Sequence, residues 1–304
     1  MIRESGRRRT ASAVAAHVAA ILAAAAGPSA AGAGTQAVVL TTVENMYSAP
    51  DAGKDVVSQA LLGQVVGVLE RSDGFVRIQT PDRYTGWVAS RALFTYPDVE
   101  APRYAARGPL AEVTSLLANL YRDPDVTTAR PKAHAPMGAR LEVLKPAEDP
   151  ARRWVLVRLP SGEGAYVQSG DVELTEAGQP RRRGSGEDLV ATARRFTGVP
   201  YLWGGMSALG LDCSGLTSQV YALNGISLRR DAHMQFEDGR PVDRTDLRPG
   251  DLVFFGEKRI THVGIHAGDG RFINATTHTR PDVHEESLDD PHWAKLFRGA
   301  RRFE

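Results

Sequence analysis

The chain has 304 residues, of which 42% are hydrophobic and 24% are charged. This length fits two or three ordinary globular domains, and the composition excludes a disordered or fibrous protein. The 37 lysines and arginines nearly balance the 36 aspartates and glutamates, so no basic field indicates nucleic acid and no acidic field indicates basic partners. The single cysteine, Cys213, has no partner for an intramolecular disulfide. Its thiol is buried and inert, paired with another chain, or chemically active.

The first 33 residues have the features of an export signal. Four arginines between Arg3 and Arg9 precede an alanine-rich apolar run from Ala11 to Ala26. Ala31-Gly32-Ala33 then offers the small-x-small pattern of a cleavage site. The run is short for a membrane span, and an uncleaved anchor is the alternative. We therefore expect an exported protein, periplasmic or secreted, that has no membrane span after cleavage of residues 1–33.

Two stretches before residue 180 resemble each other. Asn45–Pro50 matches Asn119–Pro124 at an offset of 74 residues, and Trp87–Ser90 matches Tyr166–Ser169 at an offset of 79. The larger second offset indicates longer loops in the second copy. Each copy consists of short β-branched and aromatic runs divided by Gly, Pro and Asp turns, which is typical of a small all-β barrel.

These copies predict the domain organisation. Gly86-Trp87-Val88, near the end of the first copy, resembles bacterial SH3 domains. We predict SH3-like domains at residues 34–100 and 108–176, and the polar, Gly/Pro-rich stretch 177–186 is a linker. The last domain then covers residues 187–304.

The last domain contains a predicted helix that begins at the cysteine. After a helix-compatible segment at 188–196 and a glycine-rich loop comes Asp212-Cys213-Ser214-Gly215. Apolar residues then recur at helical spacing as far as Leu223. Cys213 therefore stands in the first turn, where the positive end of the helix dipole favours a thiolate.

Strand-like runs follow this helix at 251–255, 262–267 and 271–276. In the second of them, His262 and Gly264 share the face opposite the apolar side chains, and we expect a helix packed on the sheet to approach that face. An imidazole in that position can hold a thiolate as an ion pair and later protonate a leaving amine.

A catalytic imidazole also needs a polar group that orients it. Asn274 lies twelve residues after His262, in the partner strand. A bare two-residue turn would place Asn274 opposite Ile265, on the wrong face, whereas one extra residue places it opposite Gly264. We therefore predict a three-residue or bulged turn at Gly268–Gly270.

Four linked motifs give a specific resemblance. Pro200–Gly205, Asp212–Leu216, Arg248–Phe255 and His262–Ile265 resemble, in order and spacing, the NlpC family of peptidoglycan cysteine peptidases over residues 187–303. The resemblance implies an α+β, papain-like catalytic domain, in which the helix with the nucleophile packs on an antiparallel sheet, preceded here by two small all-β SH3-like barrels. It also implies hydrolysis of γ-D-glutamyl-diamino acid bonds.

The resemblance also implies roles for single residues. Cys213 matches the nucleophile and His262 the base. The third catalytic position is most often histidine in the family and is Asn274 here. Asparagine can orient an imidazole but cannot share charge with it.

Members that pair SH3 domains with this catalytic domain resemble dipeptidyl-peptidase VI, which requires a free N-terminal L-Ala. In these relatives, the residues matching Tyr201 and Asp231 bind the α-ammonium group, and those matching Asp212 and Ser214 hold the D-Glu end. A helix N-cap before residues 232–238 is the alternative role for Asp231, and both roles could coexist.

In such relatives the first SH3 domain walls off the site and adds polar contacts. Glu44 and Tyr84 are therefore candidate ligands, and a solvated glutamate and a packing tyrosine are their alternatives. We predict no cofactor and no metal site, because the C-terminal histidines lack ligand spacing and are expected at the surface: His278, His284 and His292. The expected partners are peptidoglycan-derived peptides and no nucleic acid, and the protein is expected to be a monomer.

Two other functions stay open from the sequence. An N-acetylmuramoyl-L-alanine amidase would use the same thiol chemistry, and a non-catalytic wall-binding protein would rely on the SH3-like domains alone. The sequence does not distinguish diaminopimelate from lysine as the diamino acid.

Overall fold

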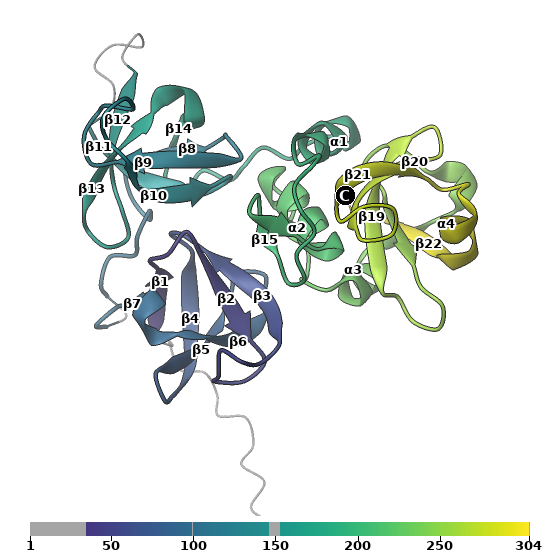
Figure 1. The fold of residues 1–304 in the computed structure, drawn as a ribbon, viewed down its shortest axis with the longest axis horizontal. Helices are drawn as coiled ribbons and strands as arrows, with labels where there is room; N and C mark the ends of the chain where they lie inside the picture. Colours follow the sequence, from purple (N-terminus) through teal and green to yellow (C-terminus); the bar gives the residue numbers. More distant parts are fainter. Residues whose placement is uncertain (1–34, 99, 146–152, 304) are drawn as a thin grey trace, which may run out of the picture. The chain divides into compact units, whose positions relative to one another are not determined.

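The computed structural model describes residues 35–98, 100–145 and 153–303, so the export signal predicted at 1–33 lies outside the described residues. The described residues belong to one compact unit and form three large antiparallel sheets, each built from consecutive strands of the chain (Figure 1).

The first sheet has seven strands in the order β3-β2-β6-β5-β4-β1-β7. A 3-10 turn, η1 (Ser90–Ala92), precedes its last strand. Its buried side chains, among them Val39, Met46 and Ile78, form a core of their own. The strands are β1 (Gln36–Val39), β2 (Val43–Tyr47), β3 (Val56–Leu61), β4 (Val65–Ser72), β5 (Phe75–Gln79), β6 (Thr85–Ala89) and β7 (Leu93–Thr95).

The second sheet repeats this arrangement in the order β10-β9-β13-β12-β11-β8-β14, with η2 (Ser169–Asp171) before its last strand. It also has a separate core, which includes Leu120, Leu141 and Val157. The strands are β8 (Pro109–Val113), β9 (Leu117–Tyr121), β10 (Pro131–Pro136), β11 (Arg140–Lys145), β12 (Trp154–Arg158), β13 (Gly164–Gln168) and β14 (Val172–Glu176).

The internal repeat is therefore a repeat of topology, because each strand of the first sheet has its counterpart at the same place in the second. β2 and β9 lie 74 residues apart and β6 and β13 lie 79 apart, as the sequence match predicts. Most of the extra length falls between β11 and β12.

The third sheet contains six antiparallel strands in the order β17-β22-β18-β19-β20-β21. They are β17 (Arg240–Val242), β18 (Leu252–Phe255), β19 (His262–Gly268), β20 (Arg271–Thr276), β21 (Asp282–Ser287) and β22 (Phe297–Arg302), with η3 (Arg244–Asp246) after β17. A small hairpin precedes the sheet in sequence and consists of β15 (Met206–Ser207) and β16 (Gly210–Leu211).

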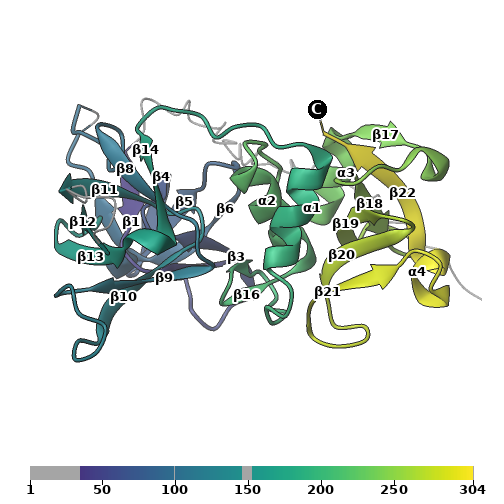
Figure 2. The ribbon, with the colours of Figure 1, turned by 90° about the horizontal axis from the view of Figure 1, so that it is seen from above.

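Four helices accompany this sheet: α1 (Gly186–Arg195), α2 (Cys213–Leu223), α3 (Ala232–Asp238) and α4 (Pro291–Leu296). Helices α1 and α2 lie on one side of the sheet and α4 on the other (Figure 2). α1 begins two residues earlier than the predicted segment because Ser185 and Asp188 form a capping box.

The predicted fold class is confirmed: an α+β part in which the helix with the cysteine packs on an antiparallel sheet follows two all-β parts. The three sheets fall within the ranges 34–100, 108–176 and 187–304. The limits of the domains and of the linker 177–186 stay predictions.

Candidate active site

Cys213 is the first residue of α2, as the sequence predicts. The side chain of the N-cap residue Asp212 accepts a hydrogen bond from Gly215 N at 2.6 Å, which fixes the start of the helix. The backbone N–H groups of Ser214 and Val263 point at the thiol. Sγ therefore lies against the peptide that joins His262 to Val263.

His262 is the first residue of β19, and its ring stacks on Trp293 of α4 with the ring centres 4.9 Å apart. Phe255 of β18 lies 5.9 Å from the same imidazole, between centres, and also contacts Trp293. These two aromatic contacts restrict the imidazole, and both His262 and Cys213 line one cavity of about 780 Å³.

The expectation that the helix packs on the His262 face of the sheet is wrong. Cys213 and the rest of α2 pack with Val263, Ile265 and Ile273, on the opposite face. Both faces of this sheet are covered, one by α1 and α2 and the other by α4. The thiol and the imidazole line the same cavity instead, and each belongs to the first residue of its element.

Asn274 occupies the place that its predicted register requires. β19 and β20 pair with Ile265 opposite Ile273, which places Asn274 opposite Gly264, and the register shifts between His266 and Gly268. The bulged turn is thus confirmed. A Cβ atom at Gly264 would lie 2.5 Å from Phe272 and 3.2 Å from Asn274 Cβ, so the residue beside Asn274 has to be glycine.

The imidazole and the amide are hydrogen-bonded. His262 Nε2 lies 2.8 Å from Asn274 Oδ1, so Nε2 carries the proton and donates it, and Nδ1 is left for the thiol. Asn274 is fully buried. Its Nδ2 donates to Glu286 Oε2 at 3.2 Å and to the His284 carbonyl at 3.4 Å. Glu286 did not emerge from the sequence, because its approach to Asn274 depends on the pairing of β20 with β21.

The electrostatics of the pair are dominated by burial. Burial raises the pKa of the Cys213 thiol to about 12, with Asp212 acting in the same direction and the Val263 and Ser214 N–H groups acting against it. Burial lowers the pKa of His262 to about 4, and Asn274 and Glu286 partly offset this effect. This burial favours the neutral thiol and the neutral imidazole, so reactivity depends on the groups that stabilise the ion pair.

The cavity that contains Cys213 and His262 is also lined by two polar residues from other parts of the chain, Tyr84 and Asp231. Tyr84 of the first sheet donates from its hydroxyl to Asp231 Oδ2 at 3.2 Å. Burial, with the Asp231 charge, raises the pKa of Tyr84 to about 12, so the phenol stays protonated and keeps donating. Asp231 occupies the N-cap position of α3, but its side chain makes no capping bond there. Its carboxylate is thus turned to the cavity rather than to the helix.

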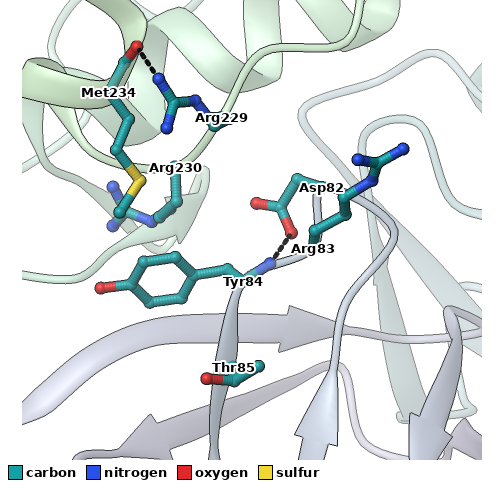
Figure 3. A pocket seen from close by; sticks show the side chains of 7 residues that line it. All are labelled: Asp82, Arg83, Tyr84, Thr85, Arg229, Arg230 and Met234. Carbon is teal, nitrogen blue, oxygen red and sulfur yellow. Dashed lines mark hydrogen bonds between the residues drawn. The ribbon is translucent and has the colours of Figure 1, made fainter. Parts of the chain in front are cut away.

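Asp212 and Ser214 line the cavity but are bound to a third side chain that the sequence did not reveal. Arg230 is almost fully buried and donates to both carboxylate oxygens of Asp212, at 3.1 and 2.6 Å, and to Ser214 Oγ at 2.8 Å. Its Nε donates to Ser58 Oγ in β3 at 3.0 Å. Figure 3 shows Arg230 and Tyr84 on facing segments of a neighbouring pocket.

Of the two remaining predicted residues, one lines the cavity and the other does not. Tyr201 lines the cavity, and burial together with the neighbouring Cys213 raises the pKa of its phenol. Glu44 is not among the lining residues; it lies near Thr41, Ala89 and Arg91, and burial raises its pKa. The carboxylate that the first sheet brings to the cavity is Asp55, just before β3.

The surface position predicted for the C-terminal histidines is wrong for His284, which is buried. Its ring lies 2.7 Å from Asp282 Oδ1 and 2.7 Å from Thr279 Oγ1. Within the described ranges, no three His, Cys, Asp or Glu side chains gather as metal ligands would. In the same part of the chain, no helix combines the length and the apolar character needed to cross a membrane.

Two sequence families match the chain. The NlpC/P60 family matches residues 198–302, which include Cys213, His262 and Asn274. The bacterial dipeptidyl-peptidase Sh3 domain matches residues 46–93, which include Tyr84 and Asp55 but not Glu44.

Individual proteins extend the likeness over most of the chain. A γ-D-glutamyl-L-lysine dipeptidyl-peptidase of Bacillus cereus is 32% identical over 258 residues, which are 81% of this chain and 74% of that one. Dipeptidyl-peptidase 6 of Lysinibacillus sphaericus is 27% identical over 84% of this chain and 93% of its own. The crystal structure of an NlpC/P60 family protein from Bacillus cereus superposes with a TM-score of 0.76 at 26% identity, and covers 88% of this chain and 99% of that one.

Proposed function

This chain belongs to the NlpC/P60 family, and we propose that it is a cysteine peptidase that hydrolyses γ-D-glutamyl-diamino acid bonds in short cell-wall peptides with a free N-terminal L-Ala. The observation that carries the proposal is the shared cavity, which contains the Cys213–His262 pair together with the Tyr84–Asp231 pair. A nucleophile and an ammonium-binding carboxylate in one cavity fit a substrate whose amino group lies a fixed distance from the cleaved bond.

In the proposed reaction Cys213 is the nucleophile. Its proton passes to His262 Nδ1, and Sγ attacks the γ-carbonyl of D-Glu to form a thioester as the C–N bond breaks. The departing amine takes the proton from the imidazolium. Water then attacks the thioester with His262 as the base, which releases the dipeptide and restores the thiol. Asn274 holds the imidazole through Nε2 during both steps.

The developing oxyanion needs donors. The backbone N–H of Cys213 stands at the first position of α2, where helical geometry leaves it without an intrahelical acceptor. We assign this group to the oxyanion, with the Tyr201 hydroxyl as a second donor, because burial keeps that phenol protonated beside Cys213. This proposal replaces the role at the α-ammonium group that the resemblance implies for Tyr201.

The free amino group of the substrate would bind at Asp231. A carboxylate that faces an ammonium group in a closed cavity makes a strong charge-assisted hydrogen bond. Tyr84 holds Asp231 from the first sheet, and Asp55 adds a second negative charge to the same cavity. An acylated amino group would carry no positive charge and would leave these carboxylates without compensation.

The roles predicted for Asp212 and Ser214 change in this proposal. Both are engaged by Arg230, and Asp212 also accepts from Gly204 N at 2.9 Å and Gly215 N at 2.6 Å. We therefore propose that Asp212 fixes the wall of the D-Glu subsite together with Arg230, and that Ser214, which also lines the cavity, contacts the substrate.

The leaving diamino acid would lie on the His262 side, because His262 protonates its amine. Arg259 and Thr261 line the cavity there, in the loop before β19. A guanidinium at this place favours a leaving group with a carboxylate, so we propose that Arg259 contacts the carboxyl end of the diamino acid.

The test is cleavage of defined tripeptides by the full chain. Mass spectrometry should show release of L-Ala-D-Glu from L-Ala-γ-D-Glu-diaminopimelate or from its L-lysine analogue, and no release by Cys213→Ala. N-acetylation of L-Ala should lower kcat/KM about 100-fold, as expected for the loss of a buried charge pair. Activity that survives in Cys213→Ala would refute the nucleophile. Equal cleavage of free and acetylated peptides at the D-Glu bond would refute the ammonium site. Cleavage of the acyl–L-Ala bond in place of the D-Glu bond would favour the amidase.

The place of action is a further part of the proposal. We propose that the protein is exported and acts on released wall peptides as a monomer, on the basis of the arginine and alanine pattern of residues 1–33. Cell fractionation with N-terminal sequencing of the exported form tests the export, and a cytoplasmic, full-length protein would contradict it. The molar mass in light scattering tests the monomer.

A further inference from the structure

Asn274 is held from behind by β21. Its Nδ2 donates to Glu286 Oε2 at 3.2 Å and to the His284 carbonyl at 3.4 Å. An amide carries its donor and its acceptor on opposite branches, so these bonds turn Oδ1 towards His262 Nε2. Glu286 and the His284 carbonyl therefore determine which way the Asn274 amide faces.

Glu286 reaches Asn274 because of the register of three strands. Asn274 has His284 directly opposite in β21 and Gly264 opposite in β19. His262 and Glu286 lie two residues along the strand from those partners, on the same face, and are the diagonal neighbours of Asn274. Strands β19, β20 and β21 thus align an imidazole, an amide and a carboxylate.

The side chain of Glu286 is 9% exposed, and a buried carboxylate requires hydrogen-bond donors. Its second oxygen, Oε1, accepts from Thr279 Oγ1 at 3.3 Å and lies 3.6 Å from His284 Nε2. His284 is held in turn by Asp282, with Nδ1 and Oδ1 2.7 Å apart. Asn274 Nδ2 and Thr279 Oγ1 both donate to Glu286, one to each carboxylate oxygen, and such donors are the partners that a buried carboxylate requires.

We propose that Glu286 is a positioning residue of this site, which acts through Asn274 to fix the His262 imidazole and to supply the negative charge that asparagine lacks. The proposal rests on the proposed function for the roles of Cys213 and His262. A chain with asparagine at the third catalytic position would in this way still have a carboxylate connected to its base, His262, through Asn274.

The charges around His262 indicate what Glu286 contributes. Three titratable groups on three elements act on the pKa of the imidazole: Asp212 before α2, Glu286 on β21 and His292 on α4. The two carboxylates raise the pKa of His262 and His292 lowers it. Glu286 is connected to His262 by two successive hydrogen bonds through Asn274. Because proton transfer from Cys213 creates an imidazolium, a carboxylate in this position stabilises the reactive ion pair more than the neutral pair.

The test measures the reactivity of Cys213 directly. The full chain contains one cysteine, so the rate of alkylation by iodoacetamide between pH 4 and 10 reports that thiol alone. In Glu286→Gln we expect a rate about tenfold lower at pH 7 and thiolate formation displaced to higher pH. With a cleavable tripeptide, kcat should fall about tenfold while KM stays within about twofold.

A matched control lies on the same strand. Glu285, next to Glu286, faces the other way and pairs with Arg271 and Arg194. Glu285→Gln should reproduce the wild-type alkylation profile. Glu286→Asp keeps the charge and should recover part of the lost rate, which a merely structural role of the side chain would not produce.

The outcomes separate this proposal from the peptidase proposal. If the wild type cleaves none of the tripeptides, the proposed function fails, while the alkylation profile still decides on Glu286. A folded Glu286→Gln protein with the wild-type profile overturns the inference. The double variant is a second way to overturn it. If adding Glu286→Gln to Asn274→Ala lowers the alkylation rate by a further full tenfold, Glu286 acts without Asn274 and the inference fails. If Glu286→Gln fails to fold, Thr279→Val, in an exposed loop, should lower the rate at pH 7 about threefold, and an unchanged rate overturns the inference.

Discussion

The two seven-stranded sheets have the same strand order but different relations to the candidate active site. The first contributes Asp55 and Tyr84 to the wall of the cavity, whereas the lining residues within the described ranges include none from the second. Each sheet has its own apolar core. The comparison indicates that the barrel is a support in both copies, and that a few side chains on its loops decide whether it takes part in recognition.

One turn shows the difference most clearly. In both sheets the turn between the fifth and sixth strands in chain order, β5 and β6 in the first sheet and β12 and β13 in the second, is closed by the same two backbone hydrogen bonds. They are Thr80–Tyr84 and Arg83–Thr80 in the first sheet, and Leu159–Glu163 and Gly162–Leu159 in the second. Tyr84, which holds Asp231, therefore corresponds to Glu163, which contacts Lys132 on its own sheet.

The largest expected effect concerns the arginines that attach each sheet to the rest of the unit. Arg230 is almost fully buried between Asp212 and Ser58 of the first sheet. Arg181 is a quarter exposed and binds Glu112 of the second. Arg230→Ala should lower the free energy of unfolding by about 3–5 kcal/mol, because it leaves the Asp212 carboxylate buried without its cation. Arg181→Ala should cost about 1 kcal/mol. Urea denaturation measures both, and equal losses would contradict the difference between the two attachments.

Acid should loosen the six-stranded sheet before either barrel. Burial lowers the pKa of His262 from 6.5 to about 4. As the pH falls below 6.5 the unfolded chain takes up this proton while the folded chain stays neutral, so the stability held by the neutral imidazole is complete above pH 6.5 and is lost towards pH 4. Hydrogen exchange should show β19 and β20 losing protection first in this window. His262→Gln should reduce that loss, and His134→Gln, at an exposed position of the second sheet, should not. Loss of protection in β5 or β12 first would contradict the prediction.

The next effect tests the corresponding turn residues. Tyr84→Phe removes the hydroxyl that donates to Asp231, and we expect kcat/KM for a free tripeptide to fall about tenfold, mainly through KM. Glu163→Gln, at the corresponding position of the second sheet, should leave kcat/KM within about twofold. Steady-state kinetics with free and N-acetylated peptides measure both. A Tyr84→Phe enzyme that loses activity equally on the two peptides would contradict a role at the ammonium group.

What could be predicted from the sequence is what depends on near neighbours. The helix start at Cys213 follows from spacing within one element, and the place of Asn274 opposite Gly264 follows from one hairpin. Predicting the place of Glu286 would have required the register of a third strand, β21, against β20. The length of the loop between these two strands does not determine that register. The side of the sheet on which α2 packs was predicted wrongly. The alternation of apolar and polar residues along a strand shows which residues share a face of the sheet. It does not show which face a given helix covers when helices cover both.

The contributions of the first sheet were the least predictable. Tyr84 lies in the cavity as expected, but Glu44 lies elsewhere and Asp55 takes part instead. All three are polar residues in or beside short strands, and which of them faces the cavity depends on how the barrel contacts α3. Arg230 was missed for the same reason, since its partner Ser58 is 172 residues away in sequence.

The smallest expected effect concerns the backbone of the turn before Tyr84. It tests whether this turn only supports Tyr84 or itself takes part in substrate recognition. Arg83 has a positive φ of 66°, whereas the corresponding residue of the second sheet is Gly162, with a φ of 88°. A left-handed conformation costs an arginine about 1–2 kcal/mol, and glycine avoids this cost but gains entropy in the unfolded chain. Arg83→Gly should therefore stabilise the protein by about 0.5 kcal/mol in urea denaturation and leave kcat/KM within about twofold, since Arg83 does not line the catalytic cavity. Gly162→Ala should instead cost about 1 kcal/mol. A loss of activity in Arg83→Gly at unchanged stability would mean that the turn, and not the Tyr84 hydroxyl alone, distinguishes the first sheet from the second.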